Sequence, residues 1–305
     1  MTVFILGNAA VKNANAVTHS GVFHADEVLG TVILERAIGD LRIARVAEIP
    51  ASLADDVVIF DIGNGEFDHH QPGGNGARDN GIPYASAGLL WKHFGPGIVG
   101  QSSDPEWLWN YVDETLVQGV DAWDNGTVAF VGDMSKAYTF SKMIAGFNPE
   151  WNSTESSDDA FLMAVEFARQ VFDNVFKHGI ALLSSRQLVE EAIKTSSDGI
   201  MQLCKPLPWK DALFTSRNVK ASEILFVVYP SDRGGYCWQA VQDRPGSLTQ
   251  RVNAPSKWWG LSGKELQDAT GVSDAIFCHR TSFTGSAESL EGAIAIAKIA
   301  IASDR

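Results

Sequence analysis

The chain has 305 residues, of which 45% are hydrophobic and 10% aromatic, and its 37 acidic against 24 basic side chains give a formal net charge of −13. This apolar content excludes an intrinsically disordered chain, because a folded protein of this length buries about 75% of the surface that its unfolded chain exposes. The acidic balance argues against a protein that grips duplex DNA by broad phosphate neutralisation. We expect a globular protein of one or two domains, in which any phosphate chemistry depends on metal ions or a few clustered cations.

The cysteines and the termini indicate the compartment. Cys204, Cys237 and Cys278 are an odd number without metal-type spacing, so we interpret them as small buried hydrophobic residues in a reducing compartment. The N-terminal residues lack the charged start and the apolar run of a signal peptide, and no segment approaches the roughly 20 apolar residues of a membrane span. We therefore expect a cytoplasmic protein without a membrane partner.

The first 60 residues predict alternating strands and helices. Residues 17–20, 42–46 and 57–60 are short β-type runs, and residues 25–38 form a helical pattern. The last of these runs, VVIF, is apolar throughout, as in a parallel sheet covered on both faces. Residues 63–81 contain six glycines, which predicts a loop that approaches another group closely or moves.

Helices dominate the middle of the chain and strands return near its end. Residues 86–94, 105–122, 135–145 and 158–195 carry helical patterns. Residues 223–229 and 236–242 are expected to form a hairpin around a Gly-rich turn, followed by a strand at 275–279 and a helix at 287–301. We place a boundary near residue 195, which gives an N-terminal domain of residues 1–195 and a smaller α/β domain of residues 196–305.

Histidines and carboxylates gather in the first part of the chain. His19 ends the first predicted strand, His24 and Asp26 open the helix that follows, and Asp61 directly follows the apolar strand. Because open α/β folds bind ligands at the carboxyl edge of the sheet, we expect these side chains to converge there. Imidazole with carboxylate suits Mn²⁺, Zn²⁺ or Fe²⁺, whereas carboxylates alone suit Mg²⁺. Glu27 is either a partner of these ligands or a helix first-turn charge.

Asp68, His69 and His70 form a second motif of the same kind. A single His beside an Asp is often only a hydrogen-bonded pair, but two such motifs flanking Asp61 would cost several kcal/mol in desolvation if they bound nothing. The combined set suffices for two ions about 3.5–4 Å apart, an arrangement that activates water in phosphoryl transfer. The sequence therefore predicts a metal centre.

Two later segments offer further candidates. GVDAWDNG contains Asp121 and Asp124, and we expect at least one of them to be a ligand; the alternative is a turn that closes the helix, with Asp121 solvated. Ser86 is an N-cap or part of an anion-binding helix N-terminus. His93, late in the same helix, either pairs with a substrate phosphate or only complements the helix dipole.

The motifs resemble a known family. THSGVFHADE from Thr18, DIG at Asp61, FDHHQ around Asp68, SAGLLWKHFG from Ser86 and VDAWDNG around Asp121 are similar to the melanocyte-proliferating-gene (Myg) family of metal-dependent hydrolases, which is related to the DHH phosphoesterase superfamily. Further segments in the family's order, from FNPEWN to AIFCHRTSFTGS, extend the resemblance over nearly all of the chain after about residue 17.

The resemblance implies a DHH-type α/β domain with a parallel sheet and two divalent ions, Mn²⁺ first with Mg²⁺ or Zn²⁺ as alternatives, joined to a smaller α/β substrate-binding domain. Family members are described as 3′-to-5′ exonucleases acting on RNA. This sequence departs from the pattern at His24, where the superfamily usually has Asp one residue closer to the first histidine, and at Gly285-Ser286, where a Gly-Gly pair is expected. The implied metal ligands are His19, His24, Asp26, Asp61, Asp68, and Asp124 or Asp121.

The resulting hypothesis is phosphodiester hydrolysis by an activated water, with Asp68, His69 and His70 as the catalytic group and a histidine of this motif stabilising the developing charge. In the C-terminal part, Arg251, His279 and Arg280 are candidates to hold a distal phosphate. Salt bridges for the arginines and a core hydrogen bond for the histidine are the alternatives. The Trp258-Trp259 pair either stacks a base or packs in the core.

The expected partner is single-stranded RNA or a short oligonucleotide rather than duplex DNA, with a homodimer as an open alternative. Two other functions stay open. A small-molecule phosphatase or pyrophosphatase is one, because an acidic surface favours short substrates. A metal-binding regulatory protein, which keeps the fold without the chemistry, is the other.

Overall fold

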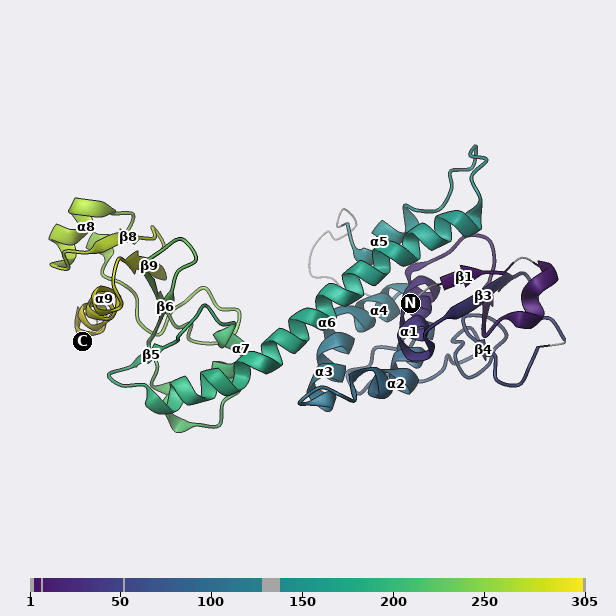
Figure 1. The fold of residues 1–305 in the computed structure, drawn as a ribbon, viewed down its shortest axis with the longest axis horizontal. Coiled ribbons are helices and arrows are strands. Elements are labelled where there is room, and N and C mark those ends of the chain that lie inside the picture. The colour runs from purple at the N-terminus through teal and green to yellow at the C-terminus, as the bar shows by residue number, and fades with distance from the viewer. Residues whose placement is uncertain (1–2, 7, 52, 128–137, 304–305) are drawn as a thin grey trace. The chain divides into compact units, whose positions relative to one another are not determined.

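The computed structural model describes residues 3–6, 8–51, 53–127 and 138–303 (Figure 1). The chain divides into two compact units, Met1–Ile180 and Ala181–Arg305. The division lies inside helix α6 (Ser157–Thr195), before the expected boundary near residue 195. The reason is that Val189 and Ile193, near the end of α6, pack in a hydrophobic core of the second unit.

The first unit is built on a parallel four-stranded sheet. Its strand order is β1 (Val3–Ile5), β3 (Leu41–Val46), β2 (Ala16–His19) and β4 (Val58–Ile59). The three predicted strands are present, and β1 is an addition of three residues. Strand β4 lies at the edge, where it pairs only with β2, so its side chains are half-buried and only the following Phe60 is fully covered. The expectation that residues 57–60 are covered on both faces is therefore wrong for most of that run.

Helices of the first unit follow the predicted order with three differences, the first of which is that the helix expected at 86–94 continues to Val99. The helix expected at 105–122 is interrupted by a π-helical turn, and the helix expected at 135–145 is observed from Phe140, while residues 135–137 lie outside the described residues. Helices α1 and α2 pack closely because Gly30 lacks a side chain; a Cβ there would lie 2.9 Å from Leu90 Cδ1. The bounds are α1 Ala25–Ile38, α2 Ser86–Val99, α3 Pro105–Val112, the π-turn Asp113–Val117, α4 Gln118–Asp124 and α5 Phe140–Ala145, with a 3₁₀ turn at Asn8–Asn13.

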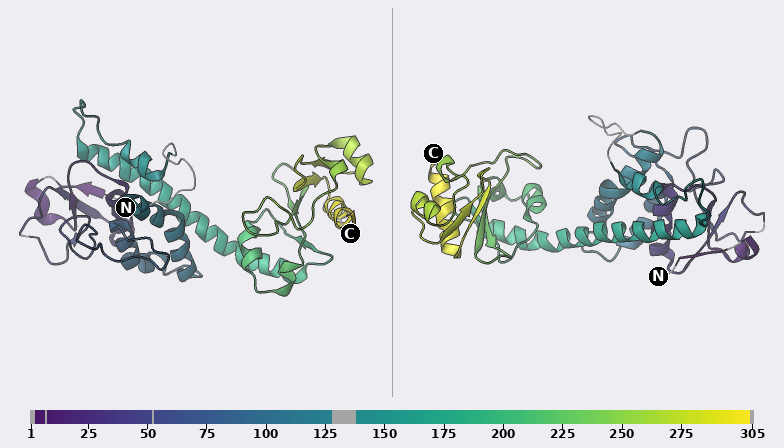
Figure 2. Two further views of the ribbon diagram at one scale, coloured as in Figure 1. Left: turned by 180° about the vertical axis from the view of Figure 1, so that it is seen from behind. Right: turned by 90° about the horizontal axis from the view of Figure 1, so that it is seen from above.

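The second unit contains a mixed five-stranded sheet. Its strand order is β5 (Ile200–Gln202), β6 (Phe226–Pro230), β7 (Tyr236–Ala240), β9 (Thr284–Ala287) and β8 (Ala275–Cys278), with β5 and β6 parallel and the other pairs antiparallel. The predicted hairpin is β6–β7. Helices α7 (Trp209–Thr215), α8 (Gly263–Thr270) and α9 (Leu290–Ser303) complete the unit, with 3₁₀ turns at Val219–Ser222 and Ser256–Trp258. Helix α9 packs against the sheet (Figure 2) and starts later than expected, because the residues before it pair as β9.

Burial places Trp258 in the core and tests the interpretation of the cysteines. Trp258 is fully buried in the core of the second unit, whereas Trp259 is 46% exposed. Of the three free cysteines, Cys278 is buried and Cys237 half-buried, but Cys204 is exposed in the bend after β5, so the interpretation of all three as buried is wrong. Among the described residues, no helix combines the length and the apolar character needed to cross a bilayer.

Candidate metal centre

Side chains of ligand type converge where β2 and β4 end. His19 is the last residue of β2, Asp61 follows β4 closely, and Asp26 and Glu27 lie in the first turn of α1. The strands are parallel, so their carboxyl ends meet at one edge of the sheet, as the sequence predicts. A cleft of about 700 Å³ lies over this edge, and its walls include His19, His24, Asp61, Asp68, His70 and Asp124.

Asp61 lies between two groups of ligand-type atoms. Its Oδ2 is 3.3 Å from His19 Nε2, whereas its Oδ1 is 3.8 Å from His69 Nδ1 and 3.6 Å from His70 Nδ1. The hydroxyl of Ser86 also donates to Oδ1, at 3.2 Å. The backbone φ of Asp61 is +56°, in the left-handed region that aspartate adopts more readily than most residues. Each carboxylate oxygen thus faces a different set of imidazoles, which suits a bridging ligand.

The first group consists of His19, His24 and Glu27, whose ligand atoms lie within 4.8 Å of one another. Glu27 is fully buried; its Oε1 is 3.0 Å from His19 Nε2 and accepts the backbone N–H of His24 at 2.9 Å. Its Oε2 is also buried and has no hydrogen-bond partner among the described residues. An orphaned buried carboxylate oxygen is costly, and a cation would satisfy it, so this group fits a divalent metal. Glu27 thus fills both of its expected roles, since it lies beside the candidate ligand His19 and also caps the first turn of α1.

The two carboxylates around His19 change its titration. Hydrogen bonds to Asp61 and Glu27 raise the pKa of His19 from 6.5 to about 10, against burial, which lowers it. The pKa is higher in the folded than in the unfolded chain. In the metal-free protein, the stability that this pair contributes is therefore complete below pH 6.5 and is lost as the pH rises through about 10.

Proton release is the expected consequence for metal binding. An imidazole must be neutral to bind a cation, so Mn²⁺ should displace the His19 proton at pH 7 and bind more tightly as the pH rises toward 10. Titration calorimetry in buffers of different ionisation enthalpy measures the protons released. His19→Gln should release one proton fewer than the wild type. Equal proton release by the two proteins would contradict this assignment.

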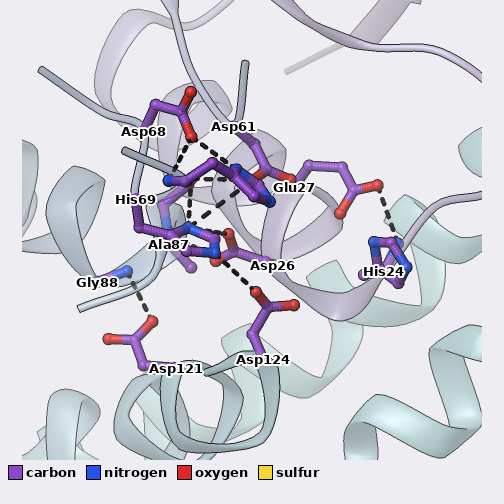
Figure 3. A network of polar contacts seen from close by, with 12 residues as sticks. His24, Asp26, Glu27, Asp61, Asp68, His69, Ala87, Gly88, Asp121 and Asp124 are labelled. Carbon is purple, nitrogen blue, oxygen red and sulfur yellow. Dashed lines mark hydrogen bonds and ion pairs between the residues drawn. The ribbon is translucent and has the colours of Figure 1, made fainter. Parts of the chain in front are cut away.

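The second group consists of Asp26, His69 and Asp124. His69 Nε2 is 2.9 Å from Asp124 Oδ2, and its Nδ1 is 3.6 Å from Asp26 Oδ2 and 3.3 Å from Ser86 Oγ. Only 7% of the His69 side chain is exposed. Figure 3 shows that these side chains point toward one another from α1, α4 and the loop after β4.

Asp26 is anchored by the N-terminus of α2. Its carboxylate accepts the backbone N–H of Ser86 at 2.8 Å and that of Ala87 at 2.6 Å. The anion at this helix end is thus Asp26, and the N-cap is Ala85, so the interpretation of Ser86 as the N-cap is wrong. Burial and the neighbouring carboxylates, Asp61 first, raise the pKa of Asp26 well above its usual range. So much negative charge in one place is what a bound cation would offset.

Asp68 organises its own loop. Its Oδ1 is 2.7 Å from His70 Nδ1 and accepts the His70 backbone N–H at 3.1 Å, and its Oδ2 accepts the Asn64 N–H at 2.6 Å. Burial would raise the pKa of Asp68, but these hydrogen bonds and the imidazole outweigh it, so the pKa lies below its usual value. The His70 ring stacks on His69, with centroids 4.3 Å apart, and is 58% exposed in the cleft wall. Asp68 therefore holds His70, which faces the cleft, and the ligand atoms of Asp68, His70, Asp61 and His69 also lie within 4.8 Å of one another.

The two aspartates of α4 have different surroundings. Asp121 is fully buried, accepts the Gly88 N–H at 3.0 Å and is 2.7 Å from Arg78 Nη1. Burial raises its pKa to about 7, although the arginine opposes the shift. Figure 3 shows Asp121 turned toward Gly88, whereas Asp124 faces the second group. The alternative of a solvated Asp121 is therefore wrong, and the structure places only Asp124 among the candidate ligands.

The other predicted substrate residues lie away from these groups or have local partners. His93 lies outside the cleft wall: its ring packs beside Phe67 and Phe94 in a separate hollow, and its Nδ1 is 3.6 Å from Glu66 Oε1. His93 is therefore separate from the cleft, and its contact with a substrate phosphate stays a prediction.

Three of the predicted substrate residues belong to the second unit. Arg251 Nη1 donates to the backbone carbonyls of Ala221, Ser222 and Ile224, so it holds that turn through carbonyl groups and not through the salt bridge considered as an alternative. His279 and exposed Arg280 lie in the turn between β8 and β9. His279 Nδ1 accepts the backbone N–H of Thr281 at 3.2 Å and lies 2.6 Å from the Thr281 hydroxyl. The hydrogen-bond partner of His279 is therefore local, two residues along the chain.

Two residues that sequence reasoning missed hold the turn between His19 and His24. Asn148 pairs with both backbone groups of Phe23, at 2.9 and 2.8 Å, and Arg45 donates to the carbonyl of Gly21 at 2.7 Å. The quoted motif FNPEWN contains Asn148, but a partner 125 residues earlier has no local signature. These contacts fix the backbone that carries His24.

Comparisons with known proteins agree with these motifs. A MYG1 exonuclease family model, described as "Uncharacterised protein family (UPF0160)", matches residues 15–301. A MYG1 protein of Schizosaccharomyces pombe is 31% identical over 93% of this chain and 96% of its own. The MYG1 exonucleases of Mus musculus and Homo sapiens are each 30% identical over 93% of this chain, and over 84% and 85% of their own. No solved structure matches the chain.

Proposed function

The chain belongs to the MYG1 exonuclease family (UPF0160), and from this premise we propose that it is a DHH-like, metal-dependent phosphodiesterase, a 3′-to-5′ exonuclease on RNA or short oligonucleotides. The observation that carries the proposal is the position of Asp61, whose two carboxylate oxygens face different groups of imidazoles at the sheet edge. The exonuclease names of the mouse and human relatives favour nucleic acid as the substrate.

In this proposal the two groups would hold two divalent ions, and Asp61 lies between the two groups. One set is His19, His24 and Asp61 with Glu27 beside them, and the other is Asp26, Asp61, Asp68 and Asp124 with His69 among them. Mixed imidazole and carboxylate donors favour Mn²⁺. Two bound metal ions would supply an activated water and positive charge beside the phosphoryl oxygens. That charge offsets the acidic character of the chain around an anionic substrate.

The protein's own groups orient the reaction. Asp68 fixes the ring of His70 through Nδ1, so that the other ring nitrogen is available to donate to a phosphoryl oxygen when the ring is protonated. The Ser86 hydroxyl and the two α2 amides hold Asp61 and Asp26 in position. His70 is thus the substrate-facing histidine of the pair, and His69 the buried ligand.

We propose further that the substrate is single-stranded, because the net charge of −13 disfavours a long duplex. The free cysteines fit a reducing compartment, and we place the activity in the cytoplasm.

A substrate panel tests the proposal. Single-stranded RNA labelled at its 5′ end, a dinucleotide and inorganic pyrophosphate are incubated with Mn²⁺, Mg²⁺ or EDTA. Wild type should shorten the RNA stepwise with Mn²⁺ and not with EDTA. Asp68→Ala should fold normally but lose this activity, because His70 loses its hydrogen-bond partner. As a control, Asp56→Ala at an exposed position should retain the activity.

The panel also separates the alternatives. Cleavage of pyrophosphate alone would indicate a pyrophosphatase. Metal binding without cleavage of any of the three substrates would indicate a regulatory protein. Full activity of Asp68→Ala would contradict the site itself.

A further inference from the structure

An exposed tryptophan forms part of the cleft wall. Trp123 precedes the candidate ligand Asp124 in α4, lines the cleft and is 36% exposed. The apolar side chains of Val120 and Ala145 line the cleft beside it. A large aromatic side chain that is left partly exposed inside a cleft has a surface available to a ligand.

The ring is also restrained. The ammonium of Lys142, on α5, lies 5.6 Å from the centroid of the Trp123 ring. A cation over an indole face is attracted to it, so this contact favours the observed orientation of the ring. A wall that already has this orientation before a substrate enters reduces the entropy that binding has to overcome.

An apolar wall offers no favourable contact to an inorganic anion. Pyrophosphate would need only cations and hydrogen-bond donors, whereas a nucleotide carries a flat aromatic base close to its phosphate. Stacking on an aromatic side chain accepts every base, because each has a π face. The cleft volume of about 700 Å³ lies within the range of sites that enclose organic ligands.

We propose that Trp123 stacks on the base of the nucleotide whose phosphate lies at the metal groups, and so selects nucleotides over inorganic phosphates. This inference rests on the proposed function for the identity of the substrate. Because Asp124 directly follows Trp123, the stacking surface and the second group are adjacent on one helix. A base held there keeps its own phosphate beside the ligands.

Binding of products tests the proposal without turnover. Calorimetry with Mn²⁺ compares adenosine 5′-monophosphate with ribose 5-phosphate, which has the same phosphate and sugar but no base. Wild type should bind the nucleotide about 5- to 100-fold more tightly. Trp123→Ala should lose this preference while keeping its affinity for ribose 5-phosphate, and Trp123→Phe should recover most of the preference.

Three further variants complete the design. Trp151→Ala removes a tryptophan that is 94% exposed and outside the cleft wall, and it should behave like wild type. Trp123→Leu keeps apolar volume without a π face and should lose the preference even if the alanine variant folds poorly. Trp259→Ala examines the other exposed candidate and should keep the preference.

Specific results would overturn the proposal. These are equal affinity of wild type for the two ligands, a preference that survives in Trp123→Ala and Trp123→Leu, or a preference lost in Trp259→Ala instead. Hydrolysis is not part of this readout. An inactive protein that still prefers the nucleotide would contradict the proposed function and support the stacking surface. An active protein without the preference would support the proposed function and contradict the stacking surface.

Discussion

Asp61→Asn should reduce metal-dependent hydrolysis by more than about 100-fold, because residues that only support metal ligands already cost about 10- to 100-fold when changed. Asp61 faces both groups, with one oxygen toward His19 and the other toward His69. Asparagine keeps the shape and the Ser86 hydrogen bond but removes the charge. It also tolerates the φ of +56°, at which alanine would be strained.

The same variant should gain less stability from metal than wild type does. Asp61 is the first of the charges that raise the pKa of Asp26, so its removal relieves repulsion between buried carboxylates, but it also removes the hydrogen bond that does most to raise the pKa of His19. Thermal unfolding with and without Mn²⁺ measures this: the rise in Tm on adding Mn²⁺ should be smaller in the variant than in wild type. Exposed Asp56→Asn is the matched control. A wild-type rise in Tm with wild-type activity would contradict the bridging role.

Arg78→Met should destabilise the protein by about 3–5 kcal/mol, the usual cost of removing one partner from a buried ion pair. The guanidinium makes a bidentate pair with Asp113, at 2.8 and 2.6 Å, and a third contact of 2.7 Å with Asp121. Its carbon also lies 4.4 Å from the centroid of the Tyr84 ring. Methionine fills much of the volume but leaves two buried carboxylates without a cation.

The loss of stability caused by Arg78→Met should increase with pH. Burial already raises the pKa of Asp121 from 3.8 to about 7, and Arg78 limits that rise. Between pH 3.8 and about pH 7, Asp121 holds a proton in the folded chain that it has released in the unfolded chain. Asp121 therefore makes the stability of the fold decrease as the pH increases. Without Arg78 the folded pKa rises further, and denaturation at pH 5 and pH 8 should show the larger loss at pH 8.

Two variants check the cause. Adding Asp121→Asn to Arg78→Met should recover stability and flatten the pH dependence, because a neutral amide removes one of the orphaned charges. Arg36→Met, which breaks a partly exposed pair with Asp173, should cost far less. The same loss at both pH values, or no recovery in the double variant, would contradict the buried network.

Local patterns predicted the parts of the centre that lie at strand and helix ends. The helix at 25–38 has the predicted bounds, and His19, Asp26 and Asp61 converge because parallel strands end at one edge. Residues that act across long sequence separations had no such pattern. Arg78 meets Asp113 and Asp121 from a glycine-rich loop, and only the folded chain shows that Asp121 is committed there while Asp124 faces His69.

The second unit shows how packing overrides local preference. Residues 284–287, TGSA, have little β-propensity, yet they form β9 between β7 and β8. A Cβ at Gly285 would lie 2.3 Å from the Phe277 carbonyl oxygen and 2.3 Å from Trp238 Cζ2. The close approach of Phe277 and Trp238 therefore requires glycine at this position. Strand β9 forms because it pairs with β7 and β8, so it cannot be predicted from its own four residues.

The central claim is that the carboxylates and imidazoles around Asp61 form a divalent metal centre. Anomalous diffraction at the manganese edge, from crystals of the full chain grown with Mn²⁺, tests it most directly. We predict peaks on both sides of Asp61, one toward His19 and His24 and the other among Asp26, His69 and Asp124. A map without peaks there, or with manganese bound at Asp113 and Asp121 instead, would contradict the account.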